Sequence, residues 1–232
     1  VPPRPSLTSD KVRYVGDAVA CVIAETALQA RDAAEAVAVD VDPLPAVTKA
    51  SAAVAPGAPQ IHASAPGNVV LDYLYGEPDK VAAAFAAAAH VARLDLVNNR
   101  LVASPIEPRA ALAEYDPASG RYTFHVGSQG AFGMRNNIAS EVLGVPPDKV
   151  RVLTGNVGGS FGMKSAIYSE YACLLHGAKL LGRPVKWTDE RSGSFVSDQH
   201  GRDHELTAEL ALDKQGRFLA IRVTGYGNMG AY

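Results

Sequence analysis

The sequence is poor in cysteine, and this scarcity limits the metal chemistry that the chain can carry by itself. Cys21 and Cys173 are the only cysteines among 232 residues, and no C-x-x-C motif occurs. Iron–sulfur clusters and structural zinc sites need several closely spaced cysteine or histidine ligands, so we expect neither from this chain. Both cysteines lie in apolar stretches, which predicts buried small hydrophobic side chains. A reducing, cytoplasmic compartment fits this composition.

An excess of charge of either sign is also missing. Lysine and arginine number 22 against 24 aspartates and glutamates, for a net charge of −2, and no basic stripe stands out, which disfavours nucleic acid as a partner. No apolar run approaches the roughly 20 residues that cross a bilayer, so we expect no transmembrane segment. With 47% hydrophobic residues, the chain can form a core in one large domain or two small ones.

The most informative stretch is the glycine-rich segment Val157–Lys164, VGGSFGMK. A β-type run, 149–153, precedes it, and an apolar pattern with helical period follows it. The apolar positions that predict one helix face are Ile167, Tyr171, Leu174, Leu175, Ala178 and Leu181. Glycine permits positive φ and close approach to the backbone, and the free N–H groups at a helix start favour a bound anion. A tight connection that needs glycine only for its turns is the alternative.

Comparison with known glycine-rich motifs limits the possible functions of this segment. A Walker A loop is excluded because Met163 separates Gly162 from Lys164, and no G-x-G-x-x-G register occurs. The pattern G-x-S-x-G does occur around Ser160, which raises the alternative of a serine hydrolase. Its triad would be completed by His200 or His204 with Asp189 or Asp198. Residues 154–157 separate this serine from the preceding strand, and the predicted strand pairs are hairpins rather than repeated βαβ units, so the hydrolase is disfavoured.

Periodicity and turn residues predict the remaining elements. We expect a hairpin from 12–15 and 18–24, a helix over 27–37 capped by Thr26, and a strand at 38–41. Residues 51–67, rich in alanine, proline and glycine, predict a linker. Further along we expect a helix from Pro78, a helix over 130–143, and strands at 68–75, 91–102, 107–115, 121–127, 185–187, 205–212 and 217–225.

Charged residues near these elements have structural interpretations. Glu107 and Arg109 flank a proline and predict an ion pair or a support for a pocket. The run 189–191 predicts a solvated turn or a helix start. Gly201 and Asp203 argue against a helix that would align His200 and His204 as metal ligands.

Four ordered motifs connect the chain to a known family. They are IEPRAALAEYDPASG (106–120), SQG (128–130), LGVPPDKVRV (143–152) and VGGSFGMK (157–164). With them, nearly the whole chain resembles the large, molybdenum-binding subunit of the xanthine dehydrogenase, aldehyde oxidase and carbon monoxide dehydrogenase family. The resemblance implies an α+β fold, with the C-terminal part of an α/β hammerhead domain over 1–50, a linker over 51–67 and the N-terminal part of the first molybdopterin-binding domain over 68–232. Because both ends of the sequence are abrupt, we expect a fragment of a longer subunit.

The resemblance also implies a function. Family members oxidise an aldehyde, carbon monoxide or an N-heterocycle at a molybdopterin centre, here expected in the cytosine dinucleotide form, and pass electrons to [2Fe-2S] and FAD partners. The expected assembly is a dimer of heterotrimers with an iron–sulfur subunit and an FAD subunit. The family's catalytic base is expected beyond Tyr232, so no catalytic residue and no metal ligand is assigned here. The isolated chain is expected to be inactive, and a non-catalytic structural fragment is the second alternative.

Carried over motif by motif, the resemblance predicts a set of cofactor-binding residues. They are Gln129, Gly130, Gly159, Ser160, Phe161 and Gly162. A glutamine side chain offers a donor and an acceptor without charge, although it could also cap the following helix, and Phe161 could simply belong to the core. Two positions depart from the family. Ser160 replaces a third glycine, and Ser165 stands where xanthine-oxidising members place a substrate-contacting glutamate, which disfavours purine hydroxylation.

Overall fold

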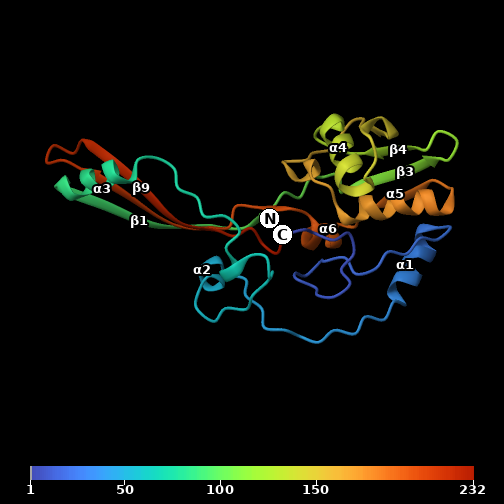
Figure 1. The fold of residues 1–232 in the computed structure, drawn as a ribbon, viewed down its shortest axis with the longest axis horizontal. Coiled ribbons are helices and arrows are strands. Elements are labelled where there is room, and N and C mark those ends of the chain that lie inside the picture. Colours follow the sequence, from blue (N-terminus) through green and yellow to red (C-terminus); the bar gives the residue numbers. More distant parts are fainter. Residues whose placement is uncertain (1) are drawn as a thin grey trace. The chain divides into compact units, whose positions relative to one another are not determined.

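The structure, a computed structural model, describes residues 2–232 and divides them into two compact units (Figure 1). The first unit comprises Pro43–Leu101 and Gly201–Tyr232, together with Pro2 and Pro3, and the second comprises Arg4–Asp42 and Val102–His200. Both units combine helices with strands, as the predicted α+β class requires. Across residues 2–232, every helix is too short or too polar to span a bilayer.

The first unit is built on an antiparallel sheet with strand order β1-β8-β9. Its strands are β1 (His90–Asn98), β8 (His204–Leu212) and β9 (Phe218–Gly227). The predicted β8–β9 hairpin is confirmed, and its turn is closed by the Asp213 N–H, which donates to the Arg217 carbonyl at 3.0 Å. Helix α3 (Pro78–Ala87) begins at the predicted proline, whose missing N–H is not needed at a helix start, and packs against β9.

Asn68 organises the segment that the sequence predicts as a linker. Its Nδ2 donates to the carbonyls of Ala53 at 2.8 Å and Pro59 at 2.9 Å, and its Oδ1 accepts from the N–H of Ile61 at 2.9 Å. The segment also holds short helix α2 (Ala50–Ala53) and a 3₁₀ turn at Pro66–Asn68. Residues 51–67 are therefore hydrogen-bonded internally, because one side chain satisfies three backbone groups.

The second unit contains a mixed sheet with strand order β5-β4-β3-β6. Strand β3 pairs antiparallel with β4 and β6, whereas β4 pairs parallel with β5. The strands are β3 (Ala110–Asp116), β4 (Arg121–Val126), β5 (Val150–Leu153) and β6 (Val185–Thr188). The chain passes from β4 to β5 through α4 (Ala131–Asn137), a π-helical turn (Ile138–Leu143) and a 3₁₀ turn (Pro147–Lys149). The expectation that strands pair only as hairpins is therefore wrong for β4 and β5.

Helix α5 (Ser169–Leu181) covers this sheet and closes the core (Figure 1). The alternation of β4 turns Tyr122, Phe124 and Val126 inward, and the Phe124 ring meets the Tyr171 ring of α5 edge-on at 5.4 Å. The helix face predicted from its period is confirmed over Tyr171–Ala178. Helix α6 (Arg191–Ser197) follows β6. The two-residue strands β2 (Leu101–Val102) and β7 (His200–Gly201) pair with each other.

Residues 2–89 contain no strand, so three predictions fail there. The hairpin over 12–24 and the strands at 38–41 and 68–75 do not form. Alternating apolar residues favour an extended backbone, but a strand also needs a neighbour with free backbone groups, and no ladder reaches these segments. The predicted helix does form as α1 (Ala27–Glu35), and a capping box between Thr26 and Gln29 fixes its start.

The N-terminal part of the second unit packs against α5 through a glycine. A Cβ on Gly177 would lie 2.4 Å from Ile23 Cδ1, so a larger residue at this position would require the Ile23 side chain to move. One helical turn earlier, Cys173 lies close to Cys21 and lowers the pKa of the Cys21 thiol to about 7. Cys21 is exposed and Cys173 is half-buried, so the expectation of two buried cysteines is wrong.

This pair predicts a thiol that reacts at unusually low pH. Iodoacetamide should alkylate Cys21 with a midpoint near pH 7, because the thiolate is the nucleophile and the ordinary thiol pKa is about 8.5. Replacing its partner, Cys173→Ala, should raise the midpoint toward the ordinary value. Peptide mass spectrometry across pH 5–10 measures both, and Cys21→Ser identifies the background. An identical midpoint in the Cys173→Ala variant would show that the pair does not set this pKa.

Candidate functional site

Three loops of the second unit meet at one edge of its sheet. Strands β4 and β5 run parallel, with His125 opposite Leu153, so the segments that follow them emerge at the same edge. Strand β3 runs antiparallel to β4, so the segment that precedes β3 lies at that edge as well. We call the three segments 105–109, 127–130 and 154–165 the loop edge.

Two hydroxyl groups join the segments that follow β4 and β5. Ser128 Oγ lies 2.8 Å from Thr154 Oγ1, which itself donates to the Val126 carbonyl at 2.9 Å. The backbone N–H of Gln129 donates to the Lys164 carbonyl at 3.4 Å. These bonds set Gln129 beside the glycine-rich segment, although the two are about thirty residues apart in the sequence.

The side chain of Gln129 is held by hydroxyl groups of that segment. Ser160 Oγ donates to Gln129 Oε1 at 2.6 Å, and Ser165 Oγ lies 3.1 Å from the same oxygen. Ser160 Oγ also accepts the Lys164 backbone N–H at 3.1 Å. Within residues 2–232, Gln129 Nε2 donates to no protein acceptor. The site residues Gln129 and Ser160 are therefore brought together, and the amide keeps donors for another group.

Phe161 stands at the exposed corner of the loop edge. Its φ of +54° is unfavourable for a residue with a Cβ, and the residue is 78% exposed, so the alternative that Phe161 is a core residue is wrong. A Cβ on Gly130 or Gly162 would meet no heavy atom within 4 Å. By contrast, a Cβ on Gly159 would lie 3.1 Å from Pro105 Cβ. The segment is therefore packed on its inner side and open at its outer side.

A buried lysine closes the inner side. Lys164 is fully buried, and its Nζ donates to the Glu107 carbonyl at 2.9 Å and to Glu107 Oε2 at 2.7 Å. The same carboxylate accepts the Gly158 N–H at 2.8 Å, and a Cβ on Gly158 would lie 2.6 Å from Glu107 Cβ. The hydrogen bond from Lys164 lowers the pKa of Glu107. The predicted ion pair between Glu107 and Arg109 is therefore wrong, because Glu107 pairs with Lys164.

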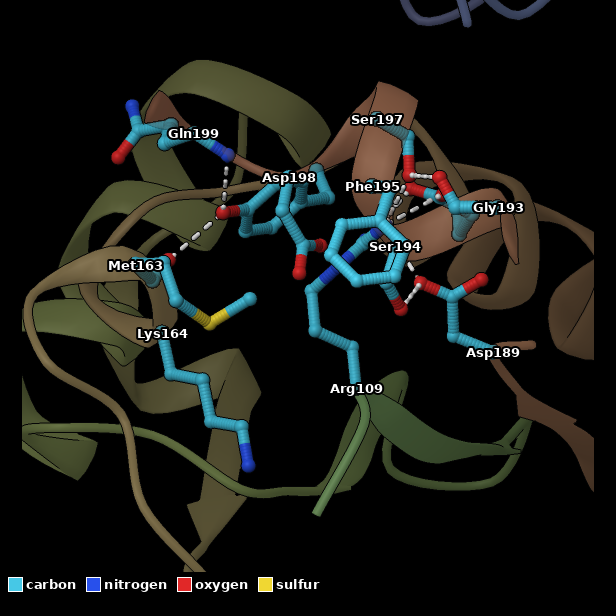
Figure 2. A network of polar contacts seen from close by, with 12 residues as sticks. Arg109, Met163, Lys164, Asp189, Gly193, Ser194, Phe195, Ser197, Asp198 and Gln199 are labelled. Carbon is cyan, nitrogen blue, oxygen red and sulfur yellow. Dashed lines mark hydrogen bonds and ion pairs between the residues drawn. The ribbon is translucent and has the colours of Figure 1, made fainter. Parts of the chain in front are cut away.

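Arg109, the last residue of the segment 105–109, instead lies in a buried network of polar side chains (Figure 2). Its guanidinium donates to Asp198 Oδ1 at 2.6 Å, to both Glu170 oxygens at 3.0 and 3.1 Å, and to Asp189 Oδ2 at 3.1 Å. It also lies 3.8 Å from the centre of the Tyr168 ring. The Asp189 side chain is only 8% exposed and burial raises its pKa, so the interpretation of 189–191 as solvated is wrong for this residue. A helix start at Arg191 is confirmed.

Tyr168 connects this network to the loop edge. Its hydroxyl donates to the Met163 carbonyl at 2.7 Å and accepts the Gln199 N–H at 3.2 Å. Burial raises the pKa of Tyr168 to about 12, so the hydroxyl stays a donor at neutral pH. Sequence reasoning missed Lys164, Glu170 and Asp198 in these roles. The signal in the sequence was a single arginine or lysine in each of two family motifs, Arg109 in 106–120 and Lys164 in 157–164.

The environment of Ser160 does not support a serine hydrolase. Among residues 2–232 its hydroxyl bonds Gln129 and the Lys164 backbone, and neither can act as a general base. Strand β5 ends at Leu153, well before the serine, whereas a nucleophile elbow follows its strand directly. A 3₁₀ turn (Met163–Ser165) also lies between the glycines and α5, so the glycines are not at the start of that helix.

Comparisons with known proteins give a consistent result. Residues 61–232 match the family described as molybdopterin cofactor-binding domain, and residues 2–45 match the aldehyde oxidase and xanthine dehydrogenase a/b hammerhead domain. The chain is 35% identical over 98% of its length to the 6-hydroxypseudooxynicotine dehydrogenase complex subunit gamma of Paenarthrobacter nicotinovorans. It is 32% identical over 97% of its length to the carbon monoxide dehydrogenase large chain of Hydrogenophaga pseudoflava.

Solved structures of similar proteins agree with these sequence matches. Reconstituted CO dehydrogenase from Oligotropha carboxidovorans matches 94% of the chain with a TM-score of 0.88 and 30% identity. Aldehyde oxidoreductase from Desulfovibrio gigas matches 97% with a TM-score of 0.85 and 31% identity. The chain spans 28% and 30% of the two sequence relatives, and 28% and 24% of the two structures, so it corresponds to less than a third of each protein.

The Arg109 network predicts a large stability cost when its cation is removed. Arg109→Met should lower the free energy of unfolding by about 3–5 kcal/mol, because it leaves buried carboxylates without a partner. Urea denaturation measures the change. The matched control, Arg183→Met, removes the exposed pair with Glu25 and should change little. Equal effects of the two substitutions would contradict a structural role for the network.

The Glu107–Lys164 pair predicts a pH-dependent contribution to stability. Because the folded pKa of Glu107 is lowered, the contribution is present above the unfolded value of about 4.3 and is lost as pH falls through the folded value. The stability difference between wild type and Glu107→Gln should therefore be constant above about pH 5 and shrink toward pH 3. Urea titrations at each pH measure it, with the exposed Glu35→Gln as control. A difference that persists unchanged at pH 3 would refute this pairing.

Proposed function

Because the chain belongs to the molybdopterin cofactor-binding domain family, we propose that its loop edge forms part of a molybdopterin site in the large subunit of a molybdenum hydroxylase. When bound, such a cofactor supplies two-electron oxidation chemistry at molybdenum. The observation that carries the proposal is the placement of the Gln129 amide beside the exposed Phe161–Gly162 corner. This chain would bind and orient the cofactor there.

The residues of the loop edge fit such a group. The free side of the Gln129 amide offers uncharged N–H donors, and the carboxylate of Glu107 is neutralised by Lys164. Open space over Gly130 and Gly162 leaves room for close contact with the backbone. The exposed Phe161 ring offers an apolar wall that would exclude water from one side.

Each proposed cofactor-binding residue then has a distinct task. Gln129 donates a hydrogen bond to an acceptor of the cofactor, and Phe161 packs against it. Gly130 and Gly162 allow close approach, whereas Gly159 allows the segment to fold tightly over Pro105. Ser160 supplies a hydroxyl at the same place. No residue of this chain is assigned as catalytic base, and we propose that the base comes from a part of the subunit beyond Tyr232.

The whole enzyme is proposed to oxidise an aldehyde, carbon monoxide or an N-heterocycle in the cytoplasm. We propose the cytosine dinucleotide form of the cofactor, with electrons passing to [2Fe-2S] clusters and FAD on partner subunits in a dimer of heterotrimers. Names of the relatives, which include a carbon monoxide dehydrogenase, a nicotine 6-hydroxylase and an aldehyde oxidoreductase, support this range. Ser165 in place of a glutamate disfavours a purine.

Exposed apolar side chains support a larger assembly. On the first unit, Leu94, Val97, Phe218 and Ile221 are each more than half exposed. Apolar surface of this kind is typical of protein interfaces, so other parts of the complex are proposed to cover it. The domain division proposed is a hammerhead part over 1–50, a linker over 51–67 and the molybdopterin-binding part over 68–232. The family matches over 2–45 and 61–232 support a hammerhead part followed by a molybdopterin-binding part.

The proposal predicts cofactor in the complete subunit. Purified with its partners, that subunit should contain molybdenum and pterin in stoichiometric amounts, and Gln129→Ala should lower both the molybdenum content and the turnover. Elemental analysis, pterin chromatography and assays with carbon monoxide, an aldehyde and an N-heterocycle measure these quantities. Gln215→Ala, in the exposed β8–β9 turn, is the matched control and should behave as wild type.

Two outcomes would reject the proposal. A wild-type subunit without molybdenum and pterin would exclude the cofactor. A Gln129→Ala variant with unchanged cofactor content and turnover would exclude this amide from the site. The isolated 232-residue chain should contain no molybdenum, because it corresponds to less than a third of its relatives, and a stoichiometric amount in it would show that the site is complete without the rest.

A further inference from the structure

We infer that Ser160 is a positioning residue that fixes the Gln129 amide with its N–H groups directed away from the protein. The inference rests on the proposed function and assigns Ser160 an action through Gln129. Its basis is the pair of bonds in which Ser160 Oγ accepts the Lys164 N–H at 3.1 Å and donates to Gln129 Oε1 at 2.6 Å.

The donor direction follows from the hydrogen-bond inventory of the hydroxyl group. A backbone N–H can only donate, so the Lys164 N–H occupies one lone pair of Ser160 Oγ. The single Ser160 proton is then free to point at the nearest remaining acceptor, which is Gln129 Oε1. Lys164 is itself immobilised by burial and by Glu107, so the backbone N–H that holds Ser160 has a fixed position.

Ser165 contributes less to the orientation of the amide. Its hydroxyl lies 2.6 Å from the Gly162 carbonyl and 3.1 Å from Gln129 Oε1, and it has one proton for the two acceptors. The shorter distance favours the Gly162 carbonyl. The two serines therefore form a natural comparison, since both approach Gln129 but only Ser160 has a proton committed to it.

The orientation matters because an amide has opposite ends. Without the Ser160 hydroxyl, the amide can rotate by half a turn and present its carbonyl outward, where it would repel an acceptor instead of donating to it. Loss of one such hydrogen bond typically weakens an interaction by about fivefold. Ser160→Thr keeps the hydroxyl and should keep the orientation, whereas Ser160→Ala should not.

A double-substitution experiment in the complete subunit tests this role. The rate of molybdenum loss during dialysis is measured for wild type, Ser160→Ala, Ser160→Thr and Ser165→Ala, each also combined with Gln129→Ala. Ser160→Ala should accelerate the loss about fivefold, Ser160→Thr should match wild type, and Ser165→Ala should change the rate by less than about twofold. In the Gln129→Ala background, Ser160→Ala should add nothing, because its partner is gone.

A second readout does not require the cofactor. In protein labelled with [15N]glutamine, the side-chain NH₂ resonance of Gln129 should shift in Ser160→Ala and stay in place in Ser160→Thr. The inference is overturned if Ser160→Ala leaves the loss rate and the resonance unchanged, or if it accelerates the loss equally with and without Gln129. A wild type without molybdenum would instead reject the proposed function, and the resonance would still decide the role of Ser160.

Discussion

The buried charge of Arg109 is the constraint on which the loop edge depends. A guanidinium taken out of water is costly unless carboxylates and rings surround it, and here Glu170, Asp189 and Asp198 do so together with the Tyr168 ring. Burial alone would lower the pKa of Arg109, but the hydrogen bonds and charges of these partners raise it. Because the partners come from the start of α5 and from either side of α6, the network fixes these elements relative to β3.

The second buried cation, Lys164, holds the glycine-rich segment in place through three contacts. Its ammonium group holds Glu107, its backbone N–H holds Ser160, and its carbonyl accepts from the N–H of Gln129. The inner side of the segment is therefore saturated with contacts. Its outer side carries the Phe161 ring, the open face of Gly162 and the free end of the Gln129 amide, and these groups are held in place before any ligand arrives.

Sequence patterns succeeded where local chemistry decides the outcome. Helix α5, helix α1 with its capping box and the β8–β9 hairpin follow from periodicity, a cap and a turn. Sequence patterns failed where the structure of a segment depends on a partner that is distant in the sequence. The segments 38–41 and 68–75 alternate as strands do but have no neighbouring strand, and Glu107 and Arg109 are two residues apart yet pair with different elements.

By itself, the sequence determined the family through four ordered motifs, the α+β class and most of the candidate residues, because these depend on residue types and on spacing along the chain. Only the tertiary structure decided that β4 and β5 run parallel, and this pairing is what brings Gln129 to Ser160. The same holds for the two buried cations, whose partners are chosen by the packing of the second unit. The sequence does not show which partner a charged side chain will take, because the partner is decided only when folding buries the charge away from water.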